Sequence, residues 1–372
     1  MRINEQRLIA DFAALVAIDS PTFGERDMAA RLRRELEALG FTVTEDDAGA
    51  RLNGTCGNLY GFLPGSLPGE PLLFCAHMDT VEPSAGKRAV FHDDGRITSA
   101  GDTVLGADDA AGIAAILEAL RTLRELDAPH RPIEVLFTVA EEQYCKGAEV
   151  FDFSALRARE AYVLDLSGPV GSAANKAPTI VSFTVTIHGK ASHAGFAPAS
   201  GVHAVVAAAH AVSGLTLGQI DPDTTVNIGT IQGGRATNIV PDLCTVTGEI
   251  RSYSHSRALA QLELVKARFT ACAEALGASV DFDTRCGCTA YETPLDSPVM
   301  ARFKAACGSL GLPVSVEGTF GGSDNNHLAL HGIAGLVIAT AMSQCHSCEE
   351  YTTAGELARA AELTLALMTA GQ

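Results

Sequence analysis

The sequence predicts an α/β protein with a mixed sheet flanked by helices, into which a smaller α+β domain is inserted. Over the first part of the chain, apolar runs typical of strands alternate with helical patterns. From about residue 179 the strands instead alternate polar and apolar residues, and after about residue 291 the first pattern returns. We therefore expect one domain made of residues 1–176 and 291–372, and an inserted domain of residues 177–290.

The first domain is expected to open with two amphipathic helices, at residues 3–18 and 25–39. The elements that follow are expected as strands 58–63 and 71–75, helix 110–126, and strands 133–139 and 162–166. The runs LLFCA, IEVLFTV and YVLDL are almost continuously apolar, as strands covered on both faces require. A parallel or mixed sheet between helices follows.

The inserted domain is expected to be a small sheet with helices on one face. Its strand patterns IVSFTVTIHG, TTVNIGTIQGG and CTVTGEIRSYS are interrupted by two helical stretches, 203–215 and 256–276. The edge strands of such a sheet favour pairing with another copy of the chain. Beyond it the first domain resumes with a helix at 298–310, an apolar run at 335–341 and a closing helix at 354–367.

The composition excludes several classes of partner. The 27 Lys and Arg against 44 Asp and Glu give a net charge of −17, which repels nucleic-acid backbones and anionic lipid surfaces. No apolar run is long enough for a membrane span, and the N-terminal residues lack a secretion pattern. We expect a cytoplasmic protein with no nucleic-acid or membrane partner, whose ten scattered cysteines are mostly reduced thiols.

Polar side chains gather where the buried strands end, which is where open α/β sheets place their sites. The residues concerned are His77 and Asp79 after LLFCA, Asp108 in the turn before a helix, Glu141 and Glu142 after IEVLFTVA, Asp165 in YVLDL, and His346 after the last apolar run. Imidazole and carboxylate ligands suit zinc, manganese or cobalt, and a carboxylate can bridge two ions. The pattern predicts a dinuclear metal site.

The spacing of these residues indicates a division of roles. Residues i and i+2 of a strand share a face, so Asp79 can orient the His77 imidazole through its second ring nitrogen. The adjacent Glu141 and Glu142 point different ways, so one can bind metal while the other takes a proton from water. A single His-x-Asp or Glu-Glu pair is often only structural, but acids gathered from five segments would repel one another unless cations joined them.

Eight segments resemble the ordered motifs of the M20 metallopeptidase family, and most closely those of its peptidase T-like branch. They are FCAHMDTVEP, LGADDAAGIAAIL, FTVAEEQYCKGA, YVLDLSGPVG, GKASHAG, GGRATNIVPD, GGSDNN and CHSCEEYT. The resemblance covers essentially the whole chain. It implies a zinc-exopeptidase-like catalytic domain with a mixed sheet, and an inserted ferredoxin-like domain that acts as a lid and forms a homodimer.

The resemblance also implies a role for each site residue. His77 and Asp165 would bind one metal ion, Glu142 and His346 a second, and Asp108 would bridge the two. The ions would be two divalent metals, with Zn²⁺ expected first and Mn²⁺ or Co²⁺ as alternatives. A cis peptide bond would follow the bridging aspartate.

Two further residues would take part in the reaction, Glu141 as the general base and Asp79 as the orienting acid. Four residues would bind substrate: His193, Asn238, Arg251 and Gly322. His193 would reach the active site of the partner subunit, although a surface role for His193 and a structural ion pair for Arg251 are the alternatives.

The sequence departs from the family pattern at Ala110, where a lysine is usual, and at Gln143-Tyr144 and Asn325-Asn326. These departures concern substrate preference more than reaction type. The activity expected first is that of an exopeptidase on short peptides, similar to a tripeptide aminopeptidase. A carboxypeptidase or N-acyl-amino-acid deacylase using the same chemistry on a small amide is the alternative, and a catalytically silent binding homologue is a third hypothesis.

Overall fold

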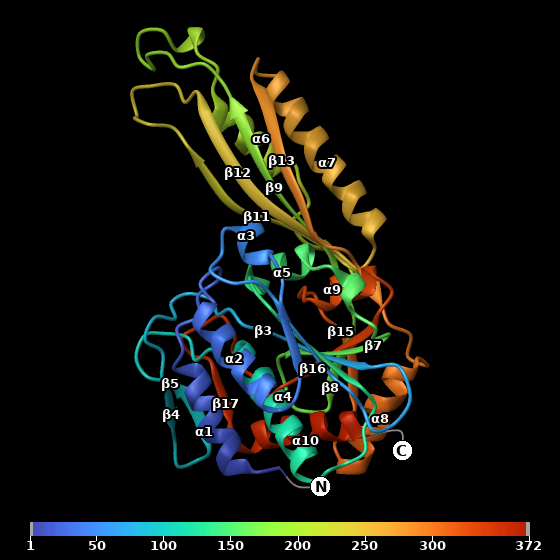
Figure 1. The fold of residues 1–372 in the computed structure, drawn as a ribbon. Helices are drawn as coiled ribbons and strands as arrows, with labels where there is room; N and C mark the ends of the chain where they lie inside the picture. The colour runs from blue at the N-terminus through green and yellow to red at the C-terminus, as the bar shows by residue number, and fades with distance from the viewer. Residues whose placement is uncertain (1–2, 370–372) are drawn as a thin grey trace. The chain divides into compact units, whose positions relative to one another are not determined.

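A computed structural model describes residues 3–369 of the chain (Figure 1). The chain divides into two units, Met1–Lys176 with Glu292–Gln372, and Ala177–Tyr291. Among the residues described, none of the helices combines the length and the apolar character needed to cross a membrane.

The first unit is built on a mixed sheet, as predicted. Within the described part of the chain nine strands form it, in the order β1-β2-β6-β3-β7-β16-β8-β14, with β15 paired to β8. Strands β6, β3, β7 and β16 run parallel, while β1, β2 and β8 join by antiparallel pairing. The bounds are β1 Thr42–Glu45, β2 Leu59–Leu63, β3 Leu72–His77, β6 Ile133–Thr138, β7 Glu160–Leu166, β8 Ser172–Ala177, β14 Tyr291–Glu292, β15 Ser315–Gly318 and β16 Ala334–Ala339.

Every residue of β3 and β6 is buried, which is why these strands are almost continuously apolar. Helices α1, α4 and α10 pack against one another, and α4 lies against β3 and β7. Helix α9 lies against β7 and β16. The helices of this unit are α1 Glu5–Val16, α2 Arg26–Ala38, α3 Ala48–Leu52, α4 Ala107–Glu125, α5 Lys146–Val150, α8 Pro298–Leu310, α9 Asn325–Leu330 and α10 Ala354–Thr369.

A separate three-stranded sheet in the first unit was not expected from the sequence. It is formed by β4 (Ala89–Phe91), β5 (Arg96–Ser99) and β17 (Tyr351–Thr353), in the order β17-β5-β4. Its strands are only three or four residues long, so they leave little periodicity to detect. The pairing of β17 with β5 ties the segment that follows His346 to the chain that precedes α4.

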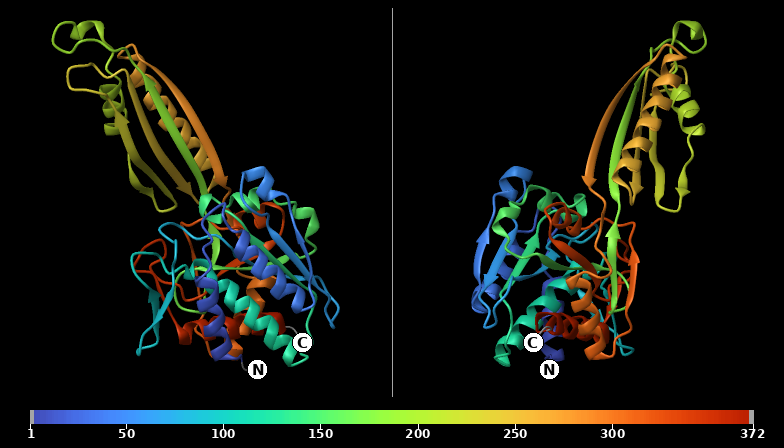
Figure 2. Two further views of the ribbon diagram at one scale, coloured as in Figure 1. Left: turned by 60° about the vertical axis from the view of Figure 1, so that its left-hand side comes forward. Right: turned by 90° about the vertical axis from the view of Figure 1, so that its right-hand side faces the viewer.

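The second unit is an antiparallel sheet with two helices packed on one face (Figure 2). The strand order is β10-β11-β12-β9-β13, and β9 alternates buried and half-buried side chains along most of its length. The elements are β9 Thr179–His188, α6 Ala204–Ser213, β10 Gly218–Asp221, β11 Thr224–Gly233, β12 Leu243–Ser252, α7 His255–Glu274 and β13 Ser279–Cys288. The short strand β10 pairs with only the first part of β11, where Gly218 lies opposite Val226.

Candidate metal centre

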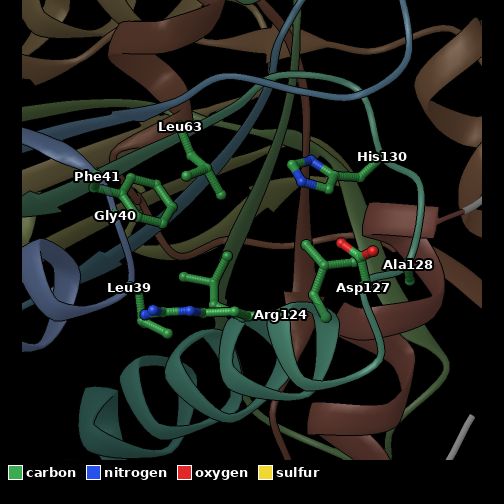
Figure 3. Close-up of a pocket in the computed structure, with 10 residues that line it drawn as sticks. Leu39, Gly40, Phe41, Leu63, Arg124, Asp127, Ala128 and His130 are labelled. Atoms are coloured by element: carbon green, nitrogen blue, oxygen red, sulfur yellow. The ribbon is translucent and has the colours of Figure 1, made fainter.

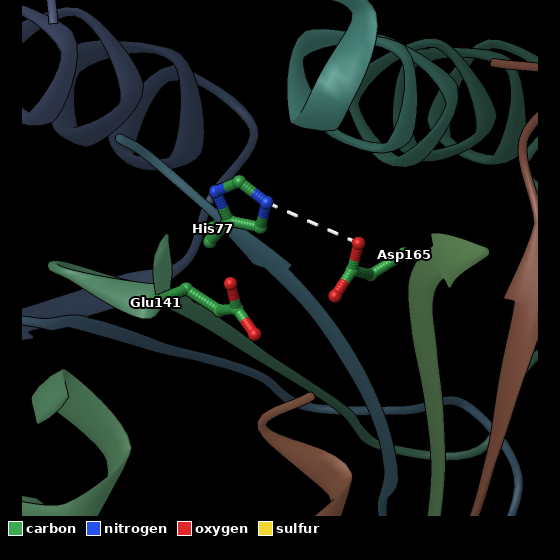
Figure 4. Close-up of side chains that lie close together, drawn as sticks. All are labelled: His77, Glu141 and Asp165. Carbon is green, nitrogen blue, oxygen red and sulfur yellow. Dashed lines mark ion pairs between the residues drawn. The ribbon is translucent and has the colours of Figure 1, made fainter. Parts of the chain in front are cut away.

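The structure brings the predicted metal ligands together at the carboxyl ends of the parallel strands. His77 is the last residue of β3, Asp165 lies one residue before the end of β7, and Asp108 is in the first turn of α4. Ligand atoms of His77, Asp108 and Glu142 all lie within 4.8 Å of one another, and so do those of His77, Glu141 and Asp165. Figure 4 shows the second group, in which His77 Nε2 is 3.9 Å from Asp165 Oδ1.

The Asp108 carboxylate lies between two imidazoles. Its Oδ1 is 3.0 Å from His77 Nε2, and its Oδ2 is 3.3 Å from His346 Nε2. The same nitrogen of His346 is 3.0 Å from Glu142 Oε2. One carboxylate that faces a different imidazole with each oxygen has the arrangement of a bridging ligand. The peptide bond between Asp108 and Asp109 is cis, as the family resemblance implies.

Asp79 holds both the histidine and the glutamate pair. His77 Nδ1 is 2.9 Å from the main-chain oxygen of Asp79 and 3.5 Å from its carboxylate Oδ1, so the carbonyl makes the shorter contact with the imidazole. The Asp79 carboxylate accepts hydrogen bonds from the N–H groups of Glu141 at 2.9 Å and Glu142 at 3.3 Å, and from the Thr22 hydroxyl at 2.8 Å. It thereby fixes the turn that presents the two glutamates.

Burial and mutual repulsion dominate the electrostatics of the centre. Burial, followed by the charges of neighbouring acids, raises the pKa values of Glu141 and Asp165 well above their ordinary range. Burial acts the same way on Asp108, but hydrogen bonds from His346 and His77 overcome it and hold the pKa of that carboxyl below its usual value. Hydrogen bonds to Asp108 and Glu142 in turn raise the pKa of His346 to about 10. The cluster therefore favours positive charge in its midst.

The donor set fits divalent cations. Glu142 Oε1 is buried and has no hydrogen-bond partner among the described residues, so a lone pair there is available to an ion. The remaining donors are imidazole nitrogens and carboxylate oxygens, the ligands that zinc and manganese accept in catalytic sites.

Buried acids that the sequence analysis left without a role surround the centre. Asp109 Oδ2 accepts the N–H of His77 at 3.2 Å. Asp324, in the segment GGSDNN, accepts from the Thr138 hydroxyl, and burial raises its pKa to about 6. A ligand oxygen of Asp324 lies within 4.8 Å of both Glu141 and the Cys145 sulfur. Both acids lie in segments singled out from the sequence, LGADDAAGIAAIL and GGSDNN, but their positions beside the ligands depend on tertiary contacts that the sequence does not reveal.

A cavity of about 250 Å³ opens onto these residues. Its lining includes Gly322, one of the predicted substrate-binding residues, and every metal-ligand candidate except His77, namely Asp108, Glu142, Asp165 and His346. Another cavity of about 340 Å³ lies away from them, between the end of α2 and the end of α4 (Figure 3). Its ionisable side chains are Arg124, Asp127 and His130, which give no metal-binding set. The chemistry therefore belongs to the smaller cavity.

The other three predicted substrate-binding residues belong to the second unit. His193 is exposed, pairs with Ile239 as an isolated β-bridge and stacks on Phe196 with ring centroids 4.3 Å apart. Asn238 lies beside it, since its main-chain oxygen accepts the N–H of Ala194. Arg251, on β12, forms an ion pair with Glu249, with Nε 2.8 Å from Oε1. This pair matches the structural alternative for Arg251.

Acids and imidazoles clustered at the carboxyl ends of the parallel strands fit the class of metallohydrolases. Two protein families match parts of the chain. The peptidase dimerisation domain matches residues 175–277, and peptidase family M28 matches residues 58–195. A solved tripeptidase of Staphylococcus aureus is 34% identical with a TM-score of 0.96, over 99% of both chains. Aminopeptidase PepT of Bacillus cereus is 37% identical with a TM-score of 0.91, over 99% of this chain and 98% of that one.

Protein YqjE of Bacillus subtilis is 36% identical over 366 residues, 98% of each chain. These similarities show that the chain belongs to the M20 family of metallopeptidases, in its peptidase T-like branch. It is therefore a hydrolase of a metal-dependent peptidase family.

The raised pKa of His346 can be tested in protein stripped of metal. The pKa of His346 in the folded protein is about 10, above the ordinary value of 6.5. Its protonation therefore stabilises the metal-free fold, and this stabilisation is complete below about pH 6.5. The stabilisation is lost as the pH rises through about 10. We expect NMR of the histidine ring to show imidazolium at pH 8, and Glu142→Gln to lower the midpoint by removing one of the two carboxylates. A neutral His346 ring at pH 8 would contradict this assignment.

Proposed function

We propose that the protein is a dinuclear-metal exopeptidase that removes the N-terminal residue from tripeptides. The observation that carries this proposal is the Asp108 carboxylate, which faces His77 with one oxygen and His346 with the other, beside the buried Glu141. The preference for tripeptides is supported by the names of the two solved relatives, a tripeptidase and an aminopeptidase, each aligned over 99% of this chain.

The proposed ligands form two sets that share Asp108. One set is His77 and Asp165, and the other is Glu142 and His346. Two divalent ions bound there would polarise the scissile carbonyl and lower the pKa of the attacking water to about 7. Zn²⁺ is the proposed metal, and Mn²⁺ and Co²⁺ have compatible ligand preferences.

Glu141 is the proposed general base, which takes a proton from the attacking water and delivers it to the leaving amine. The Cys145 thiol donates to Glu141 Oε1 at 3.2 Å, and Asp79 accepts the Glu141 N–H, so both the side chain and the main chain are held. Burial raises the pKa of Glu141, and a raised pKa suits a carboxylate that must accept and return a proton near neutral pH.

Room for substrate extends beyond the metal ligands. A cavity of about 540 Å³ shares Leu166, Ser167 and Thr319 with the cavity at the metal centre. We propose that this space receives part of the peptide. Gly322 lines the adjoining cavity at the metal centre, where the peptide would approach the metal ligands. His193, Asn238 and Arg251 are the proposed contacts from the second unit, and Arg251 would exchange Glu249 for a substrate carboxylate.

A small substrate panel tests the proposed activity. The metal-loaded protein should hydrolyse tripeptides with a free N-terminus and release the first residue, and N-acetylation of the same peptides should abolish turnover. Mass spectrometry of the products identifies the bond that is cut. Preferential cleavage of the N-acetylated peptides would favour a deacylase instead, and an inert protein carrying two metal ions would favour a binding homologue.

The two adjacent glutamates should respond differently to substitution. Glu141→Gln should keep both metal ions and lower kcat by about 100-fold to 10,000-fold, the contribution expected of a general base. Glu142→Ala should lose metal together with activity, because it removes a ligand. Metal content by mass spectrometry and steady-state kinetics separate the two effects. A Glu141→Gln protein with full metal and near-normal turnover would exclude Glu141 as the base.

A homodimer formed through the second unit is a further part of the proposal. A dimerisation-domain description matches residues 175–277. Strand β10 leaves the later part of β11 as a sheet edge, and Ile231 in that part is 49% exposed. Exposed strand edges and apolar side chains favour pairing with a second copy. In the dimer, His193 would contact substrate in the partner's active site.

Subunit mixing tests this shared site. His193→Ala should impair turnover without changing metal content, and Glu141→Gln should show the greatly lowered kcat expected above. A heterodimer of the two contains one site with both groups intact, so mixing them should restore activity. Sedimentation and exchange of differently tagged subunits provide the controls. Full activity in a monomer, or no recovery despite proven exchange, would contradict the shared site.

A further inference from the structure

Glu350 is a buried carboxylate that the reaction outlined above does not use. It lies four residues after His346 and is only 1% exposed. Its Oε2 accepts the N–H of Gly106 at 2.6 Å, and its Oε1 accepts the N–H of Asp108 at 2.9 Å. One side chain from the segment that carries His346 thus holds the main chain of the bridging aspartate.

The start of α4 needs such an acceptor. The first N–H groups of a helix have no partner within the helix, and Gly106, at the N-cap, has no side chain to supply one. The Asp108 carboxylate is directed at His77 and His346, so it is committed to the centre. Asp108 and Asp109 also have non-helical backbone angles, so this turn departs from a regular helix, and the N–H of Ala110 is 3.3 Å from the main-chain oxygen of Gly106. Glu350 supplies both missing acceptors.

The residues around the contact between Glu350 and Gly106 are closely packed. Gly106 has a φ of 74°, which strains any other residue, and a Cβ atom there would lie 2.7 Å from Cε of Lys87. Lys87 is itself buried and donates to the main-chain oxygen of Ile18 at 2.6 Å. Burial lowers the pKa of Lys87, and the negative charges of Asp19 and then Glu350 oppose this. The carboxylate therefore has a fixed, partly compensated position.

The other end of the contact is the segment that carries His346. Ser343 and Tyr351 exchange two main-chain hydrogen bonds of 3.0 Å and close residues 343–351 into a loop. The side chain of His346 is 56% exposed, so packing alone holds it weakly. Glu350 is the buried anchor of this loop, directly before β17.

We propose that Glu350 is a positioning residue that holds Asp108 and His346 in the correct relative positions. The metal position between Asp108, Glu142 and His346 depends on that arrangement. This inference rests on the proposed function, because it assumes that these residues bind metal. Groups that orient metal ligands from behind contribute about 10-fold to 100-fold to metal affinity. Glu350 would act through main-chain N–H groups of the ligand segment instead of through a ligand's ring nitrogen.

The test is a metal titration of the full chain after chelation. Glu350→Gln keeps the shape of the side chain but has one acceptor oxygen in place of two, and Glu350→Ala removes both. Co²⁺ is the probe, followed by its visible absorption and by calorimetry. Both variants should bind a first ion as the wild type does and a second about 10-fold to 100-fold more weakly, with the larger loss for Glu350→Ala. In Glu350→Gln, kcat should recover at high Co²⁺.

Glu349→Gln is the matched control, since it removes the same charge from the exposed neighbouring residue. It should bind two ions with wild-type affinities. Circular dichroism checks folding, and if Glu350→Ala does not fold, Glu350→Gln decides the question. Unchanged affinity for both ions in a folded Glu350→Gln protein would overturn the inference. A wild-type protein that binds no second ion would instead count against the proposed function.

Discussion

The burial of several carboxylates at one edge of a sheet is the constraint on which the rest of this structure depends. Asp79, Asp108, Glu141 and Asp324 are each less than 10% exposed, and Asp165 and Glu142 lie among them. Buried like charges repel one another and lose their hydration, so they are tolerated only when protons, imidazolium groups or metal ions neutralise them. Without metal, protonation of His346 and raised carboxyl pKa values do this in part.

The fold meets this constraint with rigid elements and main-chain hydrogen bonds. Parallel strands β3, β6 and β7 end at the same edge, which brings His77, Glu141 and Asp165 together although 88 residues separate the first from the last. Behind the proposed ligands, the Asp79 carboxylate fixes the Glu141–Glu142 turn and the Glu350 carboxylate fixes the start of α4. The Glu141–Glu142 turn and the start of α4 are therefore each held by an acid that is not one of the proposed metal ligands.

The sequence predicted the features that have a strong local pattern. The apolar runs of β3, β6 and β7 and the polar residues that follow them were sufficient to expect a mixed sheet with acids and histidines at one edge. The sheet of β4, β5 and β17 escaped prediction because its strands are too short for periodicity to register. The contacts of Glu350 with Gly106 and Asp108 join residues 244 and 242 positions apart through main-chain atoms, whose partners a side-chain pattern does not reveal.

The most direct test of the central claim is anomalous X-ray scattering from crystals of zinc-loaded protein, with data collected on both sides of the zinc absorption edge. We expect two peaks flanking the Asp108 carboxylate, one within about 2.0 to 2.2 Å of donor atoms from His77 and Asp165 and the other equally close to Glu142 and His346. A fully loaded crystal with no peak beside Asp108, or with zinc bound only by cysteines elsewhere in the chain, would contradict it.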